Sequence, residues 1–153
     1  MMTAIGVSIV LLGNGVTAGV MLATAIGIVP LTLVLPYRQY VQAIQFLWPR
    51  YDPFMPIVHA ATVVVGALLA VTVPAGPARV LFGTATLTLV AVMVISVIKN
   101  VPLNRYVMSL DPNHQPDDWV ERDPRPRWRV WNLLRTSLAV LALLFNATAA
   151  ASL

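Results

Sequence analysis

Residues 99–135, KNVPLNRYVMSLDPNHQPDDWVERDPRPRWRVWNLLR, separate two long apolar runs and carry most of the charge in the chain. They hold all but three of the ten Lys and Arg residues and all but one of the six Asp and Glu residues. A compact pattern lies at each end: Asn-x-Pro-x-Asn at 100–104 and Trp-x-x-Trp-Asn-x-x-Arg at 128–135. We interpret the apolar runs as membrane helices that bring these two patterns together.

The composition is typical of a membrane protein. The 153 residues are 58% hydrophobic and only 10% charged, whereas a soluble domain has about 25% charged residues. The net charge of +4 does not indicate a nucleic-acid partner, because the arginines flank apolar runs, where membrane orientation and lipid headgroups account for them. The absence of cysteine excludes disulfides, thiolate metal sites and a cysteine nucleophile.

We predict an all-α integral membrane protein with the up-down topology of a four-helix bundle, in one domain over residues 1–153. The spans are expected at about 5–33, 54–73, 80–98 and 128–150, each long enough to cross a hydrocarbon core of ~30 Å. The first run has no Lys or Arg before it and is long for a signal peptide, so we interpret it as a retained span. Pro30 is expected to bend or end that helix. No internal repeat is evident.

Residues 36–50 are predicted to form an interfacial amphipathic helix that lies in the headgroup plane. One side carries apolar and aromatic residues and the other carries arginine and glutamine; the apolar side comprises Tyr37, Tyr40, Val41, Ile44, Leu47 and Trp48. Residues 49–56 are expected to be a turn. The acidic segment after Pro116 predicts a short helix that serves as a lid or connector, with Trp119 anchoring it to the interface.

Most basic residues fall in the first and third connections between spans, and only Arg79 falls on the opposite side. The positive-inside rule therefore predicts cytoplasmic basic loops and both termini outside. We expect the protein in a bacterial cytoplasmic membrane. Within the first span, Gly15, Gly19, Ala23 and Gly27 form a stripe of small residues on which a helix can pack closely. Asn14 borders this stripe, either as a hydrogen-bonding link between helices or as a pocket residue.

The last span places Trp128, Asn132 and Arg135 on one helix face, with Trp131 beside them. A guanidinium two turns into a membrane helix is costly unless it is paired or reaches water or headgroups. Snorkelling toward the headgroups is one explanation for Arg135. The polar row that it forms with Asn132 favours the other, which is a buried functional side chain.

Asn100 and Asn104 are expected to emerge on the same membrane side as this row. As a structural motif, the pattern around Pro102 is also typical of a helix end. His59 begins the second span on that side, and a general base is most readily supplied by a histidine. His114 lies in the polar loop. No Asp or Glu lies within a predicted span and the histidines are separated, so we expect no metal site and no nucleotide cofactor.

The four spans, the KNVPLN turn, the acidic loop ending at Trp119 and the RWRVWNLLR segment resemble the anthrone oxygenase-like integral membrane family. The resemblance extends over nearly the whole chain in layout and is specific at 100–104 and 128–135. It implies oxidation of an aromatic polyketide or similar hydrophobic phenol by molecular oxygen, without an obvious metal or flavin. Many relatives have no assigned substrate, so the resemblance does not by itself fix the activity.

In this hypothesis the residues divide into one base, a set that holds an oxyanion and a set that stacks on the rings. His59 is the base. The oxyanion is held by Arg135, Asn100, Asn104 and Asn132, and the stacking walls are Trp128 and Trp131. The expected partners are a hydrophobic aromatic small molecule, molecular oxygen, membrane lipid and, for the small-residue stripe, a second copy of the chain.

Two other classes fit the same sequence. The first is a non-enzymatic scaffold or lipid-binding subunit, in which the stripe packs on a partner helix and Arg135 pairs with phosphate or a loop carboxylate. The second is a carrier for an aromatic anion, although four spans without a repeat leave little room for alternating access. An enclosed cavity beside Asn100, Asn132 and Arg135 favours an enzyme or binder, whereas a solid bundle favours a scaffold.

Overall fold

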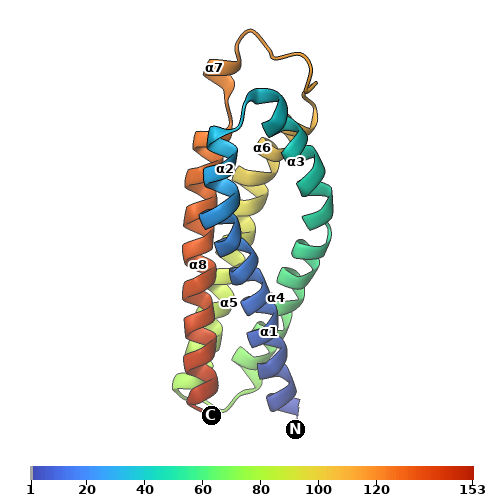
Figure 1. Ribbon diagram of the computed structural model, residues 1–153. Coiled ribbons are helices and arrows are strands. Elements are labelled where there is room, and N and C mark those ends of the chain that lie inside the picture. Colours follow the sequence, from blue (N-terminus) through green and yellow to red (C-terminus); the bar gives the residue numbers. More distant parts are fainter. Residues whose placement is uncertain (1) are drawn as a thin grey trace.

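The computed structural model describes residues 2–153, which are helical apart from short connections (Figure 1). Two of the helical segments, named η1 and η2, are single π-helical turns that continue directly into α-helix on either side. The segments are α1 (Met2–Ala23), η1 (Thr24–Ile28), α2 (Val29–Val34), α3 (Tyr37–Tyr51), α4 (Phe54–Thr72), α5 (Pro77–Ile95), η2 (Ser96–Asn100), α6 (Val101–Met108), α7 (Trp119–Arg122) and α8 (Arg125–Ala151).

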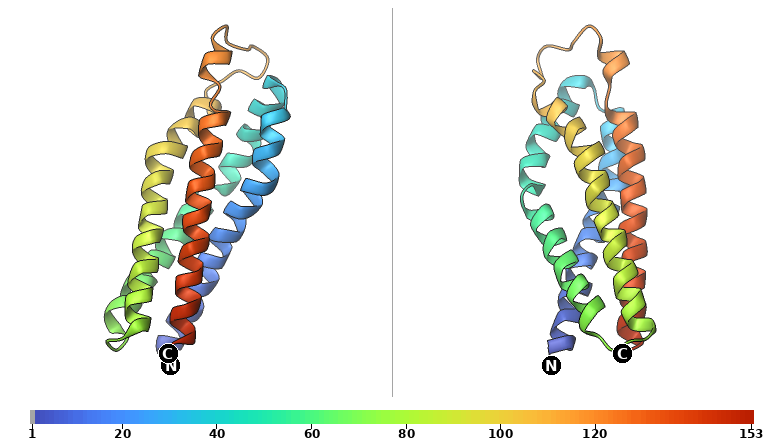
Figure 2. Two further views of the ribbon diagram at one scale, coloured as in Figure 1. Left: turned by 90° about the vertical axis from the view of Figure 1, so that its left-hand side faces the viewer. Right: turned by 180° about the vertical axis from the view of Figure 1, so that it is seen from behind.

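The long helices form an up-down bundle with both termini at one end (Figures 1 and 2). Around the bundle α1 packs on α4 and α8, and α5 packs on the same two helices. Four stretches are long and apolar enough to cross a membrane: Met2–Val34, Phe54–Thr72, Pro77–Met108 and Trp119–Ala151. The prediction of an all-α membrane bundle is therefore confirmed.

Two of these stretches contain a proline that the helix passes without ending. Pro30 was expected to bend or end its helix, and the pattern around Pro102 is typical of a helix end, yet helix continues to Val34 and Met108. In each case a π turn comes directly before the Val-Pro-Leu sequence. Proline lacks an N–H and its ring clashes with the carbonyl four residues earlier, so the wider turn provides the space that an α-turn lacks.

The two π turns also relate the two halves of the chain. Thr24 begins η1 and Ser96 begins η2, and five residues later each is followed by Val-Pro-Leu. Each turn lies in the first long helix of a helix pair. This correspondence is local, since only a few positions around each proline share it.

The segment α3 is amphipathic, as predicted, but it runs alongside α6 and does not lie flat across the end of the bundle (Figures 1 and 2). Its apolar side buries Tyr37, Tyr40, Val41 and Ile44, which pack in one cluster with Val107 and Trp119. The protein itself therefore covers the face that was expected to enter the membrane interface. The acidic loop is tied to α3, since the Tyr37 hydroxyl donates to the Asp111 carbonyl at 2.8 Å and Gln45 Nε2 donates to the Leu110 carbonyl at 2.8 Å.

Two glycines outside the predicted stripe permit close helix packing. A Cβ on Gly13 would lie 2.1 Å from Thr62 Oγ1, between α1 and α4, and a Cβ on Gly66 would lie 2.5 Å from Thr86 Oγ1, between α4 and α5. The stripe positions Gly15, Gly19 and Gly27 have nothing within 4 Å of the same atom. The predicted stripe thus faces outward, and Gly13 and Gly66 make the internal contacts.

We expect Gly13→Ala to lower the free energy of unfolding by about 1–3 kcal/mol, the usual cost of overpacking. The Thr62 side chain cannot rotate away from the new methyl group without losing a hydrogen bond, because its hydroxyl donates to the Val58 carbonyl at 2.7 Å. Gly19→Ala, on the outward stripe of the same helix, is the matched control and should leave the midpoint of thermal unfolding in detergent nearly unchanged. Equal midpoints for both variants would contradict this account of α1–α4 packing.

Candidate functional site

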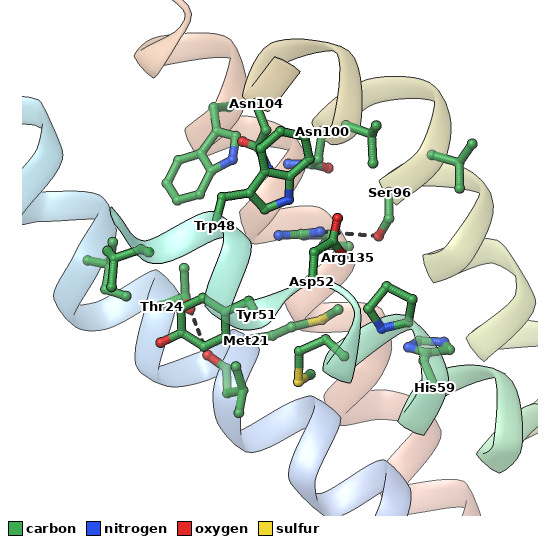
Figure 3. Close-up of a pocket in the computed structure, with 18 of the residues that line it drawn as sticks. Met21, Thr24, Trp48, Tyr51, Asp52, His59, Ser96, Asn100, Asn104 and Arg135 are labelled. Carbon is green, nitrogen blue, oxygen red and sulfur yellow. Dashed lines mark hydrogen bonds between the residues drawn. The ribbon is translucent and has the colours of Figure 1, made fainter. Parts of the chain in front are cut away.

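A cavity of about 220 Å³ lies between the helices in the half of the bundle that is distant from the termini (Figure 3). Its walls come from α1 and η1, from α3 and the start of α4, from the α5–η2–α6 stretch and from α8. Five predicted site residues line it: His59, Asn100, Asn104, Trp128 and Arg135. Both π turns contribute, through Thr24 and Ile28 of η1 and through Ser96, Val97 and Asn100 of η2.

Arg135 is turned into the bundle and is held by neutral groups (Figure 3). Its Nη2 and Nε both donate to Asn132 Oδ1, at 2.8 and 3.2 Å, and its Nη1 donates to Ser96 Oγ at 3.2 Å. In residues 2–153 no carboxylate lies within ion-pair distance of this guanidinium. The cation therefore retains the capacity to bind an anion in the cavity, where low polarity strengthens the attraction.

Two further cavity residues present polar atoms that have no hydrogen-bond partner within the described chain. Asn100 is 1% exposed, and neither its Nδ2 nor its Oδ1 is paired. The indole Nε1 of Trp128 is also buried and unpaired. Leaving such a group unsatisfied costs about 1–3 kcal/mol, so these atoms favour a polar ligand atom in the cavity that completes them.

His59 lies across the cavity on α4 and is 6% exposed. Its Nε2 is 2.9 Å from the carbonyl oxygen of Leu89 on α5. A carbonyl only accepts, so this contact assigns the proton to Nε2 and leaves Nδ1 with a free lone pair. The neighbouring helix thereby fixes both the ring orientation and the tautomer that a general base needs.

Asp52 also lines the cavity, although it was not among the residues expected at the site (Figure 3). It follows α3 at the connection to α4, within the segment that was expected to be only a turn. The signal that identifies it is simple: it is the one acidic residue outside 99–135, and it lies a short distance before His59 in the chain. No carboxylate lies inside a predicted span, but this one reaches the cavity from the end of a helix.

The aromatic walls differ in part from the prediction. Trp48 and Tyr51 of α3 line the cavity together with Trp128. Trp131 does not line it, and its ring instead faces Lys99, whose Nζ is 5.0 Å from the ring centroid. Asn132 does not line it either, but it accepts hydrogen bonds from Arg135 and so orients the cation.

Asn14 is buried on α1 without lining the cavity, and both of its amide atoms are unpaired. The structure therefore does not pair it as a link between helices. His114 lies in the loop, where its backbone carbonyl accepts from Tyr37 at 3.2 Å. Among residues 2–153, no group of three or more His, Cys, Asp or Glu side chains is arranged to hold a metal ion.

The sequence matches the family model described as Anthrone oxygenase over residues 46–145. The matched region includes every polar residue of the cavity that comes from α3, α4, α5, η2, α6 and α8. Comparisons with curated proteins and with solved structures gave no match.

Proposed function

Because the chain belongs to the anthrone oxygenase family, we propose that it is a membrane-embedded oxygenase that oxidises a hydrophobic aromatic polyketide or phenol with molecular oxygen. The observation that carries the proposal is the cavity between the helices in which the Arg135 cation, unpaired by any carboxylate of the described chain, faces the same space as the His59 imidazole. A cation stabilises the anion that forms when a base removes a proton, and the two groups are held on different helices of one rigid bundle.

The reaction balances with the substrate, oxygen and protein side chains alone. His59 Nδ1 takes a proton from the ring CH₂ of a hydroxyanthrone, and the negative charge moves to the carbonyl oxygen. The carbanion then adds O₂ to give a peroxide anion, which recovers the proton. Removal of the remaining C–H proton breaks the O–O bond and forms the quinone carbonyl and water. The ring carbon loses two electrons when the peroxide forms and two more when its O–O bond breaks. O₂ accepts all four.

The oxyanion has three donors in reach of the cavity. The Arg135 guanidinium supplies charge, while Asn100 Nδ2 and Trp128 Nε1 supply the unpaired hydrogen-bond donors. Preorganised donors of this kind act on charge as it develops and need no reorganisation. Asn104, on the turn of helix after Asn100, lines the same wall.

The size and lining of the cavity favour a flat aromatic ligand. Its volume of about 220 Å³ is below the ~300–1,000 Å³ of sites for drug-sized ligands, so it suits a few fused rings without large substituents. The aromatic side chains of Trp48, Tyr51 and Trp128 provide walls against which rings stack, and Met21, Met55 and Met93 provide adaptable apolar surface.

The direct test is oxygen uptake by the purified protein in detergent with a hydroxyanthrone such as emodin anthrone. We expect uptake above the rate of autoxidation in detergent alone, with one O₂ consumed for each anthraquinone formed. An aromatic-anion binder without chemistry would give saturable quenching of Trp48 and Trp128 fluorescence and no uptake above the detergent control. That result would replace the oxygenase by the binding alternative.

We expect His59→Gln to lower the rate of proton-dependent turnover by about 10²–10⁴-fold, the usual contribution of a general base. The glutamine amide can still donate to the Leu89 carbonyl but has no basic nitrogen, so the fold should persist. Asp52→Asn is the matched comparison, since it removes the other proton acceptor of the cavity. A large loss in Asp52→Asn with normal rates in His59→Gln would transfer the role of base to Asp52.

A further inference from the structure

A second hollow lies between α8 and the η1–α2 stretch that packs on it. Figure 1 shows where these helices run side by side. It is a groove of about 420 Å³ whose floor and walls are mostly apolar and include Val29, Leu33, Val34 and Leu133. Val34 is 78% exposed and Leu133 is 57% exposed, so the groove is continuous with the apolar surface that the bundle presents to lipid. Two polar residues interrupt this lining, Arg129 and Asn132.

Asn132 connects the groove to the cavity. Its Oδ1 accepts from Arg135, while Nδ2, on the other branch of the same amide, is buried and has no partner in residues 2–153. The whole side chain is 0% exposed. A buried amide donor without an acceptor indicates a missing acceptor atom, and the groove is the hollow that Asn132 lines on this side.

Arg129 supplies a cation at the level expected for lipid headgroups. It precedes the last residue of α8, Ala151, by 22 residues, which at 1.5 Å per residue is ~33 Å, about the thickness of the hydrocarbon core. The residue is exposed. The groove therefore combines one cation, one buried donor and apolar walls. Contacts of Arg125 with Thr32 and Leu35, and of Thr136 with Met21, place Leu33 and Val34 on the headgroup side of Arg129 and Ala25 on the membrane side.

We propose that this groove binds one anionic phospholipid, with the phosphate at Arg129 and Asn132 and an acyl chain along Val29, Ala25 and Leu133. Phosphate oxygens accept from guanidinium and amide donors, and basic sites at the headgroup level recognise anionic lipids. The lipid would hold the Asn132 amide with Nδ2 outward and Oδ1 toward Arg135. Asn132 would thus contact the lipid on one side and Arg135 of the cavity on the other, and the proposal does not depend on what reaction the cavity performs.

The test is native mass spectrometry of the purified protein in detergent with added phosphatidylglycerol, compared with phosphatidylcholine and with water-soluble glycerol phosphate. We expect one phosphatidylglycerol molecule to be retained at lipid concentrations that leave phosphatidylcholine unbound. Arg129→Gln should weaken this binding about fivefold, because one basic residue near the membrane contributes about 1 kcal/mol to anionic-lipid binding.

Arg127→Gln is the matched control, because Arg127 is an exposed arginine two residues away that does not line the groove. It should retain the lipid. Leu133→Trp keeps both polar groups but crowds the apolar wall, and it should also weaken lipid binding. If Arg127→Gln and Arg129→Gln weaken phosphatidylglycerol binding equally, the lipid responds to the overall positive charge of this end of the protein and not to the groove. Binding of glycerol phosphate as tight as that of the lipid would make the groove a free-anion site. Either result would overturn the proposal.

Discussion

Arg135→Ala is expected to lower anthrone-dependent oxygen uptake by about 10²–10³-fold, the loss typical of removing one group that stabilises an oxyanion. The guanidinium is the cation of the cavity, and its nearest polar partners, Asn132 and Ser96, are neutral. Without it, the substrate anion would form in an apolar pocket with only neutral donors. The effect should fall mainly on the rate of chemistry, because the stacking walls remain.

Arg135→Gln separates charge from hydrogen bonding in this prediction. Glutamine retains an amide donor near Asn132 and Ser96, so it should restore stability without restoring the rate. Arg127→Gln removes an exposed arginine from the same helix and should leave oxygen uptake unchanged. Unchanged turnover in Arg135→Ala, with a thermal midpoint equal to that of the wild type, would remove the proposed assignment of the cation.

The second large effect is expected on stability, from Arg125→Ala. Arg125 Nη1 donates to the carbonyls of Thr32 and Leu35 at 3.1 and 2.9 Å, which closes the end of α2, and its Nη2 pairs with Asp123 at 2.6 Å. Hydrogen bonds to charged groups contribute about 1.5–3 kcal/mol each. We expect a loss of about 3 kcal/mol, because one side chain joins α2, the α7–α8 connection and α3.

The Arg125 guanidinium also faces two rings of the α3 cluster, at 5.2 Å from the Tyr40 centroid and 5.7 Å from the Trp119 centroid. Burial, with a smaller contribution from Asp123, raises the pKa of Tyr40 above its usual value, so this ring stays neutral beside the cation. Hydrogen exchange of α7 and of the start of α3 measures the loss, since these segments should open first.

Arg122→Ala is the control for Arg125→Ala. Arg122 also pairs with an acidic residue, Asp118 at 2.7 Å, but both side chains are exposed to solvent. Surface pairs contribute about 0–1 kcal/mol, so its removal should be nearly neutral. If the two variants unfold at the same temperature, the contacts of Arg125 with α2 do not hold the end of the bundle together.

The sequence predicts the bundle because long apolar runs in lipid have only one backbone solution, and the short Pro/Gly connection forces antiparallel neighbours. It does not predict the direction of α3. An amphipathic face is equally suited to a membrane surface and to a protein surface, and only the presence of Val107 and Trp119 opposite Tyr40 decides between them. The small-residue stripe fails for a related reason, since spacing gives a common face without saying what covers it.

The sequence predicts those cavity residues that are polar and also lie deep within an apolar span. A charged residue within an apolar span has few explanations, which is why Arg135 and its neighbour Asn132 are found from the sequence. Asp52 is missed because a carboxylate in a turn is ordinary, and only the fold brings that turn to the cavity that Arg135 and His59 also line. Trp131 is the opposite case, a residue that was predicted at the site but lies outside it. Its position on α8 is next to the face that lines the cavity, and from there the indole packs outward against Lys99.

Because of the π turn at Ser96–Asn100, the number of residues in the α5–η2–α6 stretch decides which side chains face the cavity. One residue contributes about 100° of rotation to an α-helix. Because hydrogen bonds in a π turn span five residues and those in an α-helix span four, this turn absorbs one extra residue. Deleting Lys99, which is exposed, would let a regular α-helix form in which Asn104 keeps nearly the same face toward the hollow that it now borders. A deletion in the regular part of α5 would instead rotate everything beyond it, so a deletion scan should find the π turn more tolerant of losing one residue than the α-helix before it.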